Sequence, residues 1–413
     1  MRISIIGLNY APELSGNAPY TAGLARGLSL RGHDVDVLTG YPHYPGWKVD
    51  PNYTGISMSE IIEGVPVTRF RHFVPRKPTP FGRVLLEASF GARIAVADWK
   101  NPDVVLCVSP ALISSGLAIV KNRISRARVP IGVLVQDLYS RGIVETGVGG
   151  QASGRLGSQL ESSILRSASG ISVIHEKFRE HARDRLGVPD SKITVIHNWT
   201  HLKPVAKTDR IEMRRLLGWG DDEIVVLHAG NMGVKQGLEN VVEAARLADS
   251  TTPSVRFVLL GDGNQRTALE KSAAGVRSLE FVNPLPDGQF QKALAAADVL
   301  LVNEMPGVAE MSLPSKLTSY FTTGLPVLAA CGENGTTAAT IARSGGGLRV
   351  DPGEPESLLR AALTLSSDPR LAAAIGNAGK NFCERELGET QALDQYESWL
   401  SKLASNGCGR RKK

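Results

Sequence analysis

The sequence has 413 residues, of which 42% are hydrophobic and 21% are charged, and its net charge is +6. This composition excludes an intrinsically disordered chain, and the length exceeds one ordinary core, so we expect two compact domains. No apolar stretch approaches the roughly 20 residues of a membrane-spanning helix, so any contact with a membrane is expected to be peripheral.

In the first half, short apolar runs alternate with longer helical patterns, which is typical of parallel strands joined by crossover helices. We expect six strands, at residues 3–6, 35–38, 104–108, 131–135, 170–174 and 193–196. The helix after the first strand is predicted to run from about Ala18 to Arg31 and to stop at Gly32. Residues 1–203 are therefore predicted to form a doubly wound α/β domain.

The second half repeats the pattern after a polar stretch, with strands expected at 223–227, 255–260, 279–282, 299–302, 326–329 and 347–350. These strands predict a second Rossmann-like domain over residues 204–386. Ligands of such sheets bind at the carboxyl ends of the strands, so we expect a cleft between two domains facing each other. A last helix is expected at about 387–404, and the basic residues 405–413 are expected to be disordered.

Cysteine usage and the N-terminus indicate the compartment. The four cysteines lie far apart, without the short spacing of zinc or redox pairs: Cys107, Cys331, Cys383 and Cys408. The start of the chain has too few apolar residues before Gly7 for a signal peptide. We therefore expect a reduced, cytoplasmic protein.

Cations cluster in the first half, with aromatic residues among them and Glu87 as the single acid of the stretch: Arg69, Phe70, Arg71, Phe73, Arg76, Lys77, Phe81, Arg83, Phe90 and Arg93. A second group follows at Lys121, Arg123, Arg126 and Arg128. A solvated surface explains these charges as well as a phosphate-bearing partner does. Our hypothesis is docking on the anionic inner face of the plasma membrane. Nucleic acid is disfavoured because no binding motif accompanies the charges.

The loop after the first expected strand, residues 7–20, is too long and too differently spaced for the dinucleotide fingerprint G-x-G-x-x-G. A hydride-transfer enzyme is therefore disfavoured. Gly16 stands just before a helix, where an unhindered backbone and a helix N-terminus suit a phosphate. A glycine in an ordinary surface loop is the alternative.

Two glycine turns follow strands in the second half. Residues 229–237 read Ala-Gly-Asn-Met-Gly-Val-Lys-Gln-Gly and bring Gly230 and Lys235 to a helix start, which suits a diphosphate. An ordinary loop with an exposed lysine is the alternative. The turn Gly261-Asp262-Gly263 follows the next strand and by itself indicates only a turn.

The most informative segment is 303–317, Asn-Glu-Met-Pro-Gly-Val-Ala-Glu-Met-Ser-Leu-Pro-Ser-Lys-Leu, which joins a strand to a helix. At the start of that helix, Ser315 and Lys316 can offer backbone donors and an ammonium group to a leaving diphosphate. A lysine on an ordinary helix is the alternative.

Taken in order, these motifs resemble family 4 glycosyltransferases, in the branch of WcaI-like enzymes of capsule, exopolysaccharide and O-antigen assembly. The resemblance rests on residues 230–239, Leu-Gly-Asp-Gly at 260–263, Ala-Ala-Ala-Asp-Val-Leu-Leu at 295–301, and Pro-Ser-Lys-Leu at 314–317 leading to Gly-Leu-Pro-Val at 324–327. Residues 31–35 and 195–199 extend it over nearly the whole chain.

This resemblance implies the GT-B fold, a retaining mechanism and no bound metal or other cofactor. It also implies a nucleoside-diphosphate sugar on the second domain, a lipid-linked or saccharide acceptor on the first, and a last helix that crosses back to the first domain. The donor-binding positions are Gly16, Asn17, Gly230, Asn231, Lys235, Gly261, Asp262, Leu285, Pro314, Ser315 and Ser319.

Four residues are candidates for catalysis: Lys316, Asp137, His175 and Glu304. Asp137 follows the strand at 131–135, where related enzymes place a polar residue beside the sugar, and a cap of the next turn is an equally open reading. His175 begins another loop. Lys316 is predicted to stabilise the departing diphosphate.

Two departures from the family pattern bear on the donor site. Many members carry two glutamates eight residues apart, whereas Met311 and Ser319 occupy those places here. Glu304 or Glu310 is then the candidate for the first acid. Asn231 and Gln236 replace the usual arginine and lysine of the phosphate loop, so neutralisation of phosphate is expected to rest on Lys316.

Three other functions remain open from the sequence. A sugar-nucleotide 2-epimerase uses the same fold and would release product without an acceptor. A non-catalytic nucleotide-sugar sensor or scaffold is suggested by the missing glutamates. A nucleic-acid binder would show affinity that falls steeply with salt.

Overall fold

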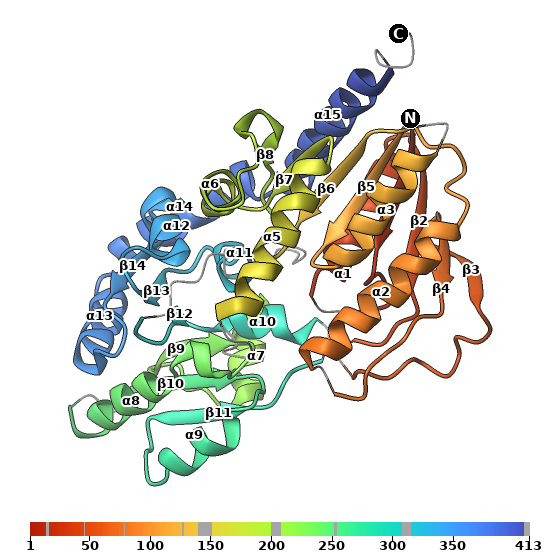
Figure 1. Cartoon of the computed structure of the whole chain (residues 1–413). Coiled ribbons are helices and arrows are strands. Elements are labelled where there is room, and N and C mark those ends of the chain that lie inside the picture. The colour runs from red at the N-terminus through yellow and green to blue at the C-terminus, as the bar shows by residue number, and fades with distance from the viewer. Residues whose placement is uncertain are drawn as a thin grey trace. The chain divides into compact units, whose positions relative to one another are not determined.

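The computed structural model describes residues 1–13, 16–44, 46–77, 79–125, 128–138, 151–199, 208–251, 254–286, 288–307 and 315–408. The chain divides into two compact units (Figure 1). Unit 1 comprises Met1–Asn198 with Thr390–Lys413, and unit 2 comprises Trp199–Glu389. The boundary expected from the sequence was 203/204, with the last helix at about 387–404.

Unit 1 contains an eight-stranded sheet in the order β3-β4-β2-β1-β5-β6-β7-β8. Its strands are β1 Arg2–Gly7, β2 Asp34–Gly40, β3 Ser57–Ile62, β4 Val65–Phe70, β5 Val104–Ser109, β6 Ile131–Val135, β7 Gly170–Val173 and β8 Ile193–Val195. All neighbours are parallel except β3 and β4. The six predicted strands are confirmed, and their continuous burial matches a parallel sheet covered on both faces.

The β3–β4 hairpin was not predicted from the sequence. Its two-residue turn, Glu63-Gly64, has positive φ angles of 50° and 81°, which fits a tight hairpin turn. On β4, Val65, Val67 and Arg69 alternate as buried residues. Because Arg69 is buried, ion-paired with Glu60 and bonded to the carbonyls of Gly40 and Ala11, its assignment to a basic surface was wrong.

The helices of unit 1 are α1 Ala18–Leu30, α2 Pro80–Val96, α3 Leu112–Ile124, α5 Gln151–Ser167, α6 Glu176–Asp184 and α15 Glu389–Cys408, with the 3-10 turn η1 Asp190–Lys192. The prediction for α1 is confirmed to within a residue, with Gly32 at a φ of 84° just beyond its end. The expected disordered tail was wrong for residues 405–408, which continue α15, and residues 409–413 lie outside the described part.

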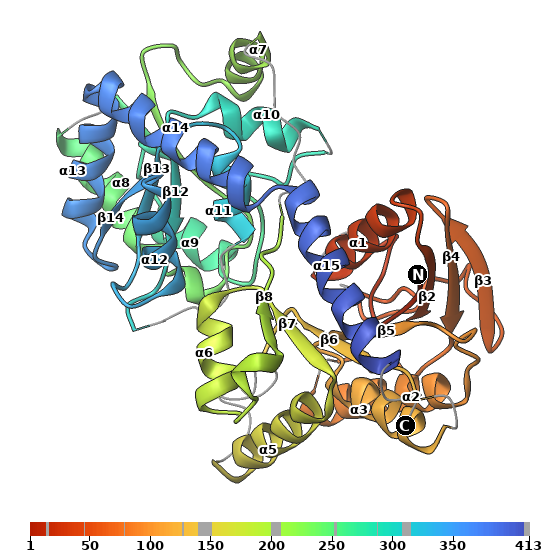
Figure 2. The ribbon, with the colours of Figure 1, turned by 90° about the horizontal axis from the view of Figure 1, so that it is seen from above.

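Helix α15 completes unit 1 although unit 2 precedes it in the chain (Figure 2). Its Glu397 accepts from Arg31 at 2.9 Å and contacts the Nε2 of His33 at 3.0 Å. A Cβ added to Gly132 on β6 would lie 2.8 Å from Trp399, and one added to Gly170 on β7 would lie 3.0 Å from Leu403. Glycines in these strands therefore make room for the large side chains of α15.

Unit 2 contains a six-stranded parallel sheet in the order β11-β10-β9-β12-β13-β14, the doubly wound arrangement. Its strands are β9 Ile224–Ala229, β10 Val255–Leu260, β11 Leu279–Val282, β12 Val299–Asn303, β13 Val327–Ala330 and β14 Gly347–Val350. Each matches a predicted strand. The order reverses between β9 and β12, so the switch point lies where these two strands end.

The helices of unit 2 are α7 Thr208–Leu217, α8 Glu239–Thr251, α9 Arg266–Ser272, α10 Gln289–Ala296, α11 Ser315–Phe321, α12 Thr336–Ser344, α13 Pro355–Ser367 and α14 Pro369–Glu386, with the 3-10 turn η2 Val234–Gln236. One buried cluster includes Leu227, Leu300 and Phe321, and a second includes Val226, Leu301 and Leu358. These clusters lie on opposite faces of the sheet, because alternate residues of one strand point to opposite sides.

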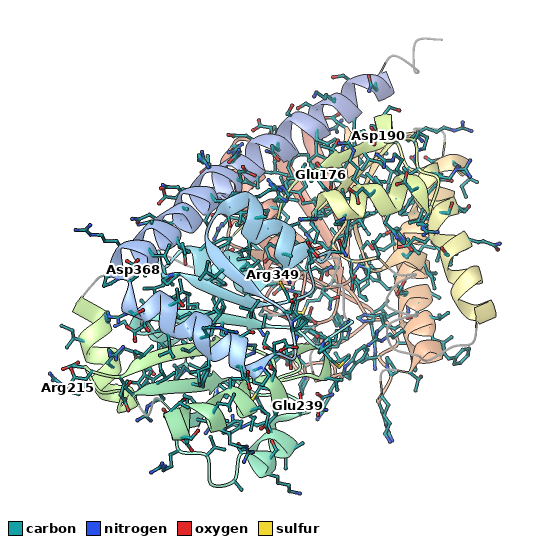
Figure 3. All side chains as sticks on the ribbon, turned by 90° about the vertical axis from the view of Figure 1, so that its left-hand side faces the viewer. Glu176, Asp190, Arg215, Glu239, Arg349 and Asp368 are labelled. Carbon is teal, nitrogen blue, oxygen red and sulfur yellow. The ribbon has the colours of Figure 1, made fainter. Side chains whose placement is uncertain are left out.

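Charged side chains lie on the outer surfaces of several helices, among them Glu176, Arg215 and Glu239 (Figure 3). Asp368, labelled in that view, accepts hydrogen bonds from the backbone N–H groups of Arg370 and Leu371 at 3.0 Å and so caps α14. In the part of the chain that the structure describes, no helix combines the length and hydropathy needed to cross a membrane.

Two further members of the predicted basic and aromatic surface prove to be structural. Phe90 is fully buried, and Lys121 donates to backbone carbonyls near the end of α2 while its ammonium group lies 4.3 Å from the ring centroid of Trp99. Arg126 lies outside the described residues. The exposed side chains of α2 and its approach include Phe73, Phe81 and Arg83. The surface is therefore smaller than the sequence suggested.

Candidate functional site

Two glycine turns pack backbone to backbone at the carboxyl ends of β9 and β10. Gly230 has a φ of 124° and Gly261 one of 136°, values that favour glycine. A Cβ on Gly261 would overlap the carbonyl oxygen of Gly230. The N–H of Met232 donates to the carbonyl of Asp262 at 2.9 Å, which ties the two turns together.

Lys316 lies over the first of these turns. Its Cε would be 3.0 Å from a Cβ on Gly230, and its Nζ lies 2.9 Å from Nε2 of His228, a buried residue of β9. Helix α11 therefore brings the ammonium group to the edge where the backbone of the Gly230 turn is bare. Two of the positions predicted to bind diphosphate, Gly230 and Lys316, are therefore in contact, and their role toward a diphosphate stays a prediction.

His228 is uncharged in this arrangement. Burial lowers the pKa of His228 well below its ordinary value, and the nearby Lys316 charge lowers it further. A neutral imidazole carries one proton, so the lysine ammonium donates to Nε2 and the ring proton lies on Nδ1. His228 was not among the residues predicted from the sequence, because a histidine inside an apolar strand looks like an ordinary core residue.

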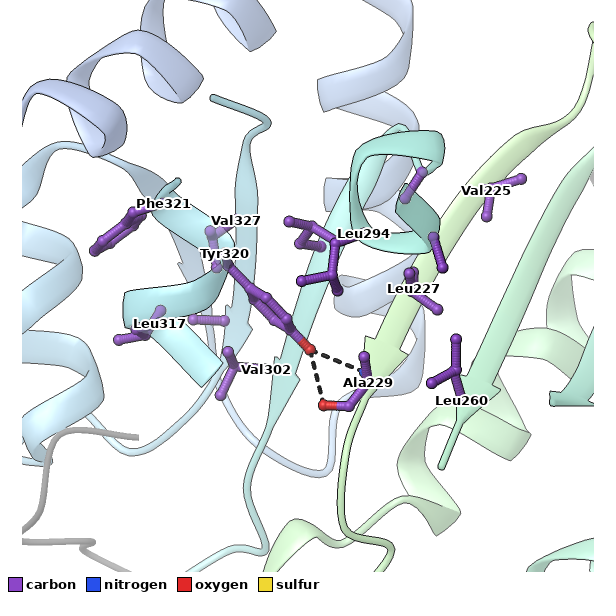
Figure 4. Close-up of a cluster of buried hydrophobic side chains, with 14 of the residues drawn as sticks. Val225, Leu227, Ala229, Leu260, Leu294, Val302, Leu317, Tyr320, Phe321 and Val327 are labelled. Carbon is purple, nitrogen blue, oxygen red and sulfur yellow. Dashed lines mark hydrogen bonds between the residues drawn. The ribbon is translucent and has the colours of Figure 1, made fainter. Parts of the chain in front are cut away.

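Tyr320 fixes α11 to the strands beneath it (Figure 4). Its fully buried hydroxyl accepts from the N–H of Ala229 at 2.9 Å and lies 3.4 Å from the carbonyl oxygens of Ala229 and Leu301. Burial raises the pKa of Tyr320 above its ordinary range, so the phenol stays protonated. The anchor sets the position of Lys316, one turn earlier on the same helix.

The loop after β12 is joined to the loop after β9 by Asn303, another residue to which the sequence pattern assigned no role. Its amide nitrogen donates to the carbonyls of Gln236 and Gly237 at 2.8 and 2.9 Å, and its oxygen accepts from Asn240. The N–H of Met305 donates to the carbonyl of Lys235 at 2.8 Å. The two phosphate-loop candidates therefore form one connected edge.

Glu304, a catalytic candidate, is 3% exposed at the end of β12. Its carboxylate accepts from the hydroxyl of Thr337 in the first turn of α12, where a negative charge is stabilised by the helix N-terminus. Beside it, burial and the Glu304 charge raise the pKa of Cys331 to about 12. This packing gives Glu304 a structural contact, and a role toward substrate stays a prediction.

The remaining donor positions of unit 2 lie along the same strand ends. Asn231, Lys235 and Asp262 are exposed in the glycine turns, and Leu285 is half-buried after β11. Ser319 is half-buried on α11, with its backbone carbonyl accepting from Thr322 at 2.7 Å. Ser315 begins α11, whereas Pro314, Glu310 and Met311 lie outside the described residues.

In unit 1, Gly16 and Asn17 precede α1, and Gly16 has a φ of 68°. The side-chain nitrogen of Asn17 donates to the carbonyl of Ser109 at 3.2 Å, and the hydroxyl of Ser109 donates to the carbonyl of Asp137 at 3.2 Å. This chain of contacts brings two predicted site residues to the same sheet edge. The carboxylate of Asp137 also accepts from the N–H of Leu138 at 2.8 Å. This contact fits the alternative hypothesis, in which Asp137 caps the turn.

His175 is the N-cap of α6, where its Nδ1 accepts from the N–H of Lys177 at 3.1 Å. Its ring lies edge-on to His197, with centroids 5.9 Å apart. Nearby, the side-chain amides of Gln136 and Asn198 exchange two hydrogen bonds of 3.0 and 2.7 Å. The carboxyl ends of β6, β7 and β8 therefore form a continuous polar edge, of which sequence reasoning had identified only part.

A second polar group at the ends of β2 and β4 was missed. Glu13 is 7% exposed and accepts from the N–H groups of His43 and Tyr44, both at 2.8 Å. The ring centroids of His72 and His43 lie 4.9 Å apart. Burial lowers the pKa of His72 to about 4, and the neighbouring His43 contributes to this shift. These histidines lie at the strand ends of the predicted acceptor domain. The sequence carried a signal for them, because each histidine follows within three residues of the end of a strand.

Among the described residues, no group of three or more histidine, cysteine, aspartate or glutamate side chains is arranged to hold a metal ion. The independence from metal that the resemblance implies stays a prediction.

Comparison of the sequence with known proteins shows the family to which the chain belongs. Residues 15–199 match the glycosyl transferase 4-like domain, and residues 209–382 match the glycosyl transferases group 1 domain. The chain is 30% identical to the putative colanic acid biosynthesis glycosyl transferase WcaI of Escherichia coli (strain K12), over 96% of this chain and 98% of that protein.

Solved structures show the same fold at lower identity. Anabaena HepE in complex with UDP has a TM-score of 0.71 and 17% identity, and it covers 97% of this chain and 100% of its own. Sucrose-phosphate synthase from Thermosynechococcus elongatus has a TM-score of 0.73 and 19% identity, over 98% and 99% of the two chains. The chain belongs to the family 4, group 1 glycosyltransferases of the GT-B fold, and it is a glycosyltransferase.

Proposed function

We propose that this glycosyltransferase takes its sugar from a nucleoside-diphosphate donor held on unit 2. The proposal rests on the position of Lys316, which lies over the Gly230 turn and is hydrogen-bonded to a neutral His228. An ammonium group beside bare backbone is what a leaving diphosphate needs, because negative charge grows on it as the sugar departs. UDP bound to HepE, which shares the fold, supports this donor class.

We infer that transfer proceeds with retention at the anomeric carbon and without a metal ion. In this mechanism the chain supplies little nucleophilic chemistry. Lys316 and the backbone of the glycine turns stabilise the diphosphate, while the polar edge of unit 1 at Asn17, Asp137 and His175 orients the sugar and the acceptor hydroxyl. The configuration of the new glycosidic bond, read by proton NMR, separates retention from inversion.

The acceptor is proposed to be a lipid-linked or saccharide intermediate of cell-surface polysaccharide assembly. The near full-length similarity to WcaI, named for colanic acid biosynthesis, supports this role. A cytoplasmic enzyme that works on a lipid-linked acceptor gains from docking at the inner leaflet. The exposed Phe73, which precedes α2, and Phe81 and Arg83 in its first turn offer apolar and cationic groups for that contact.

A thermal-shift screen with UDP, GDP, ADP and CDP and their sugar conjugates tests the donor. One nucleoside diphosphate is expected to raise the unfolding midpoint, because a ligand of the folded state stabilises it. The matching nucleotide sugar should then be turned over with release of that diphosphate. Absence of any shift at millimolar ligand, with a correctly folded protein, contradicts the proposed function.

Phosphatidylglycerol vesicles test the membrane contact. Sedimentation with these vesicles at low salt is expected for the wild type and should fall when Phe81 and Arg83 are replaced by serine and glutamine. Vesicles of phosphatidylcholine alone are the control. Equal sedimentation of wild type and variant contradicts docking through α2.

A further inference from the structure

Unit 1 has a shallow hollow, largely open to solvent, with a volume of about 900 Å³, and the candidate glycosyltransferase site does not use it. It is lined by four cations from separate segments, namely Arg123, Arg166, Arg185 and Lys192, together with four serines and a glutamine of α5. Every described residue that lines it is either cationic or an uncharged hydrogen-bonding residue. The hollow therefore has the chemistry of an anion site.

The hollow lies at the opposite sheet edge from the candidate active site. Arg123 is in the last turn of α3, Arg166 is in the last turn of α5, and Arg185 directly follows α6. Lys192 immediately precedes β8. In a parallel sheet the crossover helices run back to the amino ends of the strands, so these cations gather at the amino ends of β6, β7 and β8. A ligand here is remote from Asp137 and His175.

Two acids close to the hollow in sequence, Asp184 and Asp190, are engaged by other arginines. Asp190, labelled in Figure 3, receives two hydrogen bonds from Arg179 at 2.9 and 2.7 Å. Asp184 receives two from Arg183 at 2.7 and 2.9 Å. By contrast, within the described residues no carboxylate forms an ion pair with Arg123, Arg166 or Arg185. These three arginines are exposed, so their guanidinium groups are accessible to an external anion.

Helix ends do not cancel this charge. The C-termini of α3, α5 and α6 each contribute roughly half a negative charge, about −1.5 in all. Lys192 already meets one of them, since its ammonium group donates to the carbonyls of Arg166 and Ala168 at 2.9 Å. The three arginines carry about +3 between them, so the hollow keeps a positive charge without counting Lys192.

The wall formed by α5 is suited to phosphate oxygens. Ser158, Ser162 and Arg166 recur every four residues on one helix face, and Ser163 and Ser167 lie beside them. The hydroxyl of Ser162 donates to the carbonyl of Leu186 at 2.6 Å, which holds α5 against the segment after α6. The other hydroxyls stand beside guanidinium groups, a combination that can bind several oxygens of one anion.

We propose that this hollow binds a ligand carrying a diphosphate or two phosphate groups. Arginine forks favour phosphate over smaller anions, because planar guanidinium groups donate pairs of parallel hydrogen bonds to its oxygens. The three arginines give the hollow the positive charge that a diphosphate needs. The ligand is either a soluble phosphorylated compound or the headgroups of an anionic membrane, and both present the same phosphate chemistry.

Calorimetric titration of the full chain with inorganic pyrophosphate, at low ionic strength to limit screening, tests the site. Wild type is expected to show two binding sites, one on unit 2 and one in the hollow. The double variant R166Q/R185Q should lose one of them or weaken it at least tenfold. The control R246Q/R360Q removes the same charge from exposed positions of unit 2 and should bind as wild type.

The variant K316A separates this proposal from the proposed function. It should lose the unit 2 site and keep the site in the hollow, whereas R166Q/R185Q should keep donor binding. A second titration, with phosphatidylglycerol vesicles present, identifies the source. Displacement of pyrophosphate from the hollow assigns the ligand to lipid headgroups, and retention assigns it to a soluble compound.

Some outcomes overturn the proposal. If R166Q/R185Q binds pyrophosphate and sediments with phosphatidylglycerol vesicles as wild type does, the hollow is not a phosphate site. A wild type with a single pyrophosphate site, lost in K316A, likewise contradicts the proposal when vesicle binding is also unchanged by R166Q/R185Q.

Discussion

A single side chain, Lys316, connects the features of the proposed donor site of unit 2. It extends from the first turn of α11 over Gly230 and contacts a histidine whose charge is suppressed by burial. A charged His228 would repel the ammonium group, so the neutral imidazole fixes the lysine without competing for the diphosphate.

Replacement of Lys316 by alanine is expected to lower turnover by more than tenfold, because one charge-assisted interaction with the leaving group is lost. Initial rates with the identified donor, together with its binding constant, measure the effect. The variant K271A removes a lysine from an exposed position of α9 and serves as the control. Unchanged turnover in K316A with intact donor binding contradicts the assignment.

Gly261 has a different kind of importance, because its backbone touches the backbone of Gly230. The variant G261A places a Cβ against the Gly230 carbonyl at a φ of 136° and is expected to destabilise unit 2 by at least about 2 kcal/mol. Gly275 has a φ of 82° with open space around it, so G275A should cost only about 1 kcal/mol. Urea unfolding compares the two, and equal losses would show that the close approach adds nothing.

At the scale of elements, the parallel strands were predictable and the hairpin was not. Buried parallel strands are continuous apolar runs, and that pattern located every strand of unit 2. The β3 strand is largely exposed at the sheet edge and β4 contains Pro66 and a buried arginine, so neither shows such a run. The tight turn at Glu63-Gly64 was the available signal.

Helices α2 and α3 are joined by a buried carboxyl group. Glu87 of α2 is 6% exposed and accepts from the N–H of Ile113 in the first turn of α3 at 3.0 Å. Burial raises the pKa of Glu87 from 4.5 to about 7, and the hydrogen bonds only partly oppose this effect. Because the folded-state pKa is raised, the stability contribution is complete below about pH 4.5 and is lost as the pH rises through about 7.

The variant E87Q keeps the acceptor oxygen and removes the ionisation. Its stability relative to wild type is expected to increase by roughly 2 kcal/mol between about pH 5.5 and about pH 8. Urea unfolding at the two pH values measures this difference. E356Q, at an exposed position of α13, is the control and should show no such trend. A constant difference between E87Q and wild type would contradict the raised pKa.

The sequence identified candidate site residues that stand in a motif, and it missed candidates whose role depends on tertiary contacts. Lys316, Gly230 and Asn17 stood in recognisable loops. His228, Tyr320 and Asn303 act through partners distant in sequence, and a strand histidine or helix tyrosine alone indicates only core packing. The basic surface was overestimated for the same reason, since the burial of Arg69 depends on Glu60 and on loop carbonyls.

At the scale of the whole molecule, α15 is the element on which unit 1 depends from the far end of the chain. It contributes large buried side chains, namely Tyr396, Trp399, Leu400 and Leu403. Each is worth about 1.5–3 kcal/mol of burial, so their sum is comparable with the marginal stability of a domain.

Deletion of residues 389–413 is therefore expected to leave unit 1 without a stable fold while unit 2 stays folded. Hydrogen exchange followed by mass spectrometry reads the two units separately, and peptides from β5 and β6 should lose protection. Deletion of 409–413 alone is the control and should change nothing. Full protection of β6 in the longer deletion would show that α15 is dispensable.

Because α15 belongs to unit 1 but follows unit 2 in the chain, unit 1 is completed only late in synthesis. A ribosome that has completed residues 1–198 must still add residues 199–389 before the covering helix emerges. At about 5–20 residues per second, this interval lasts roughly 10–40 s. During that time the faces of β6 and β7 around Gly132 and Gly170 lack their covering helix, so we expect the nascent first unit to bind a chaperone more readily than the finished chain.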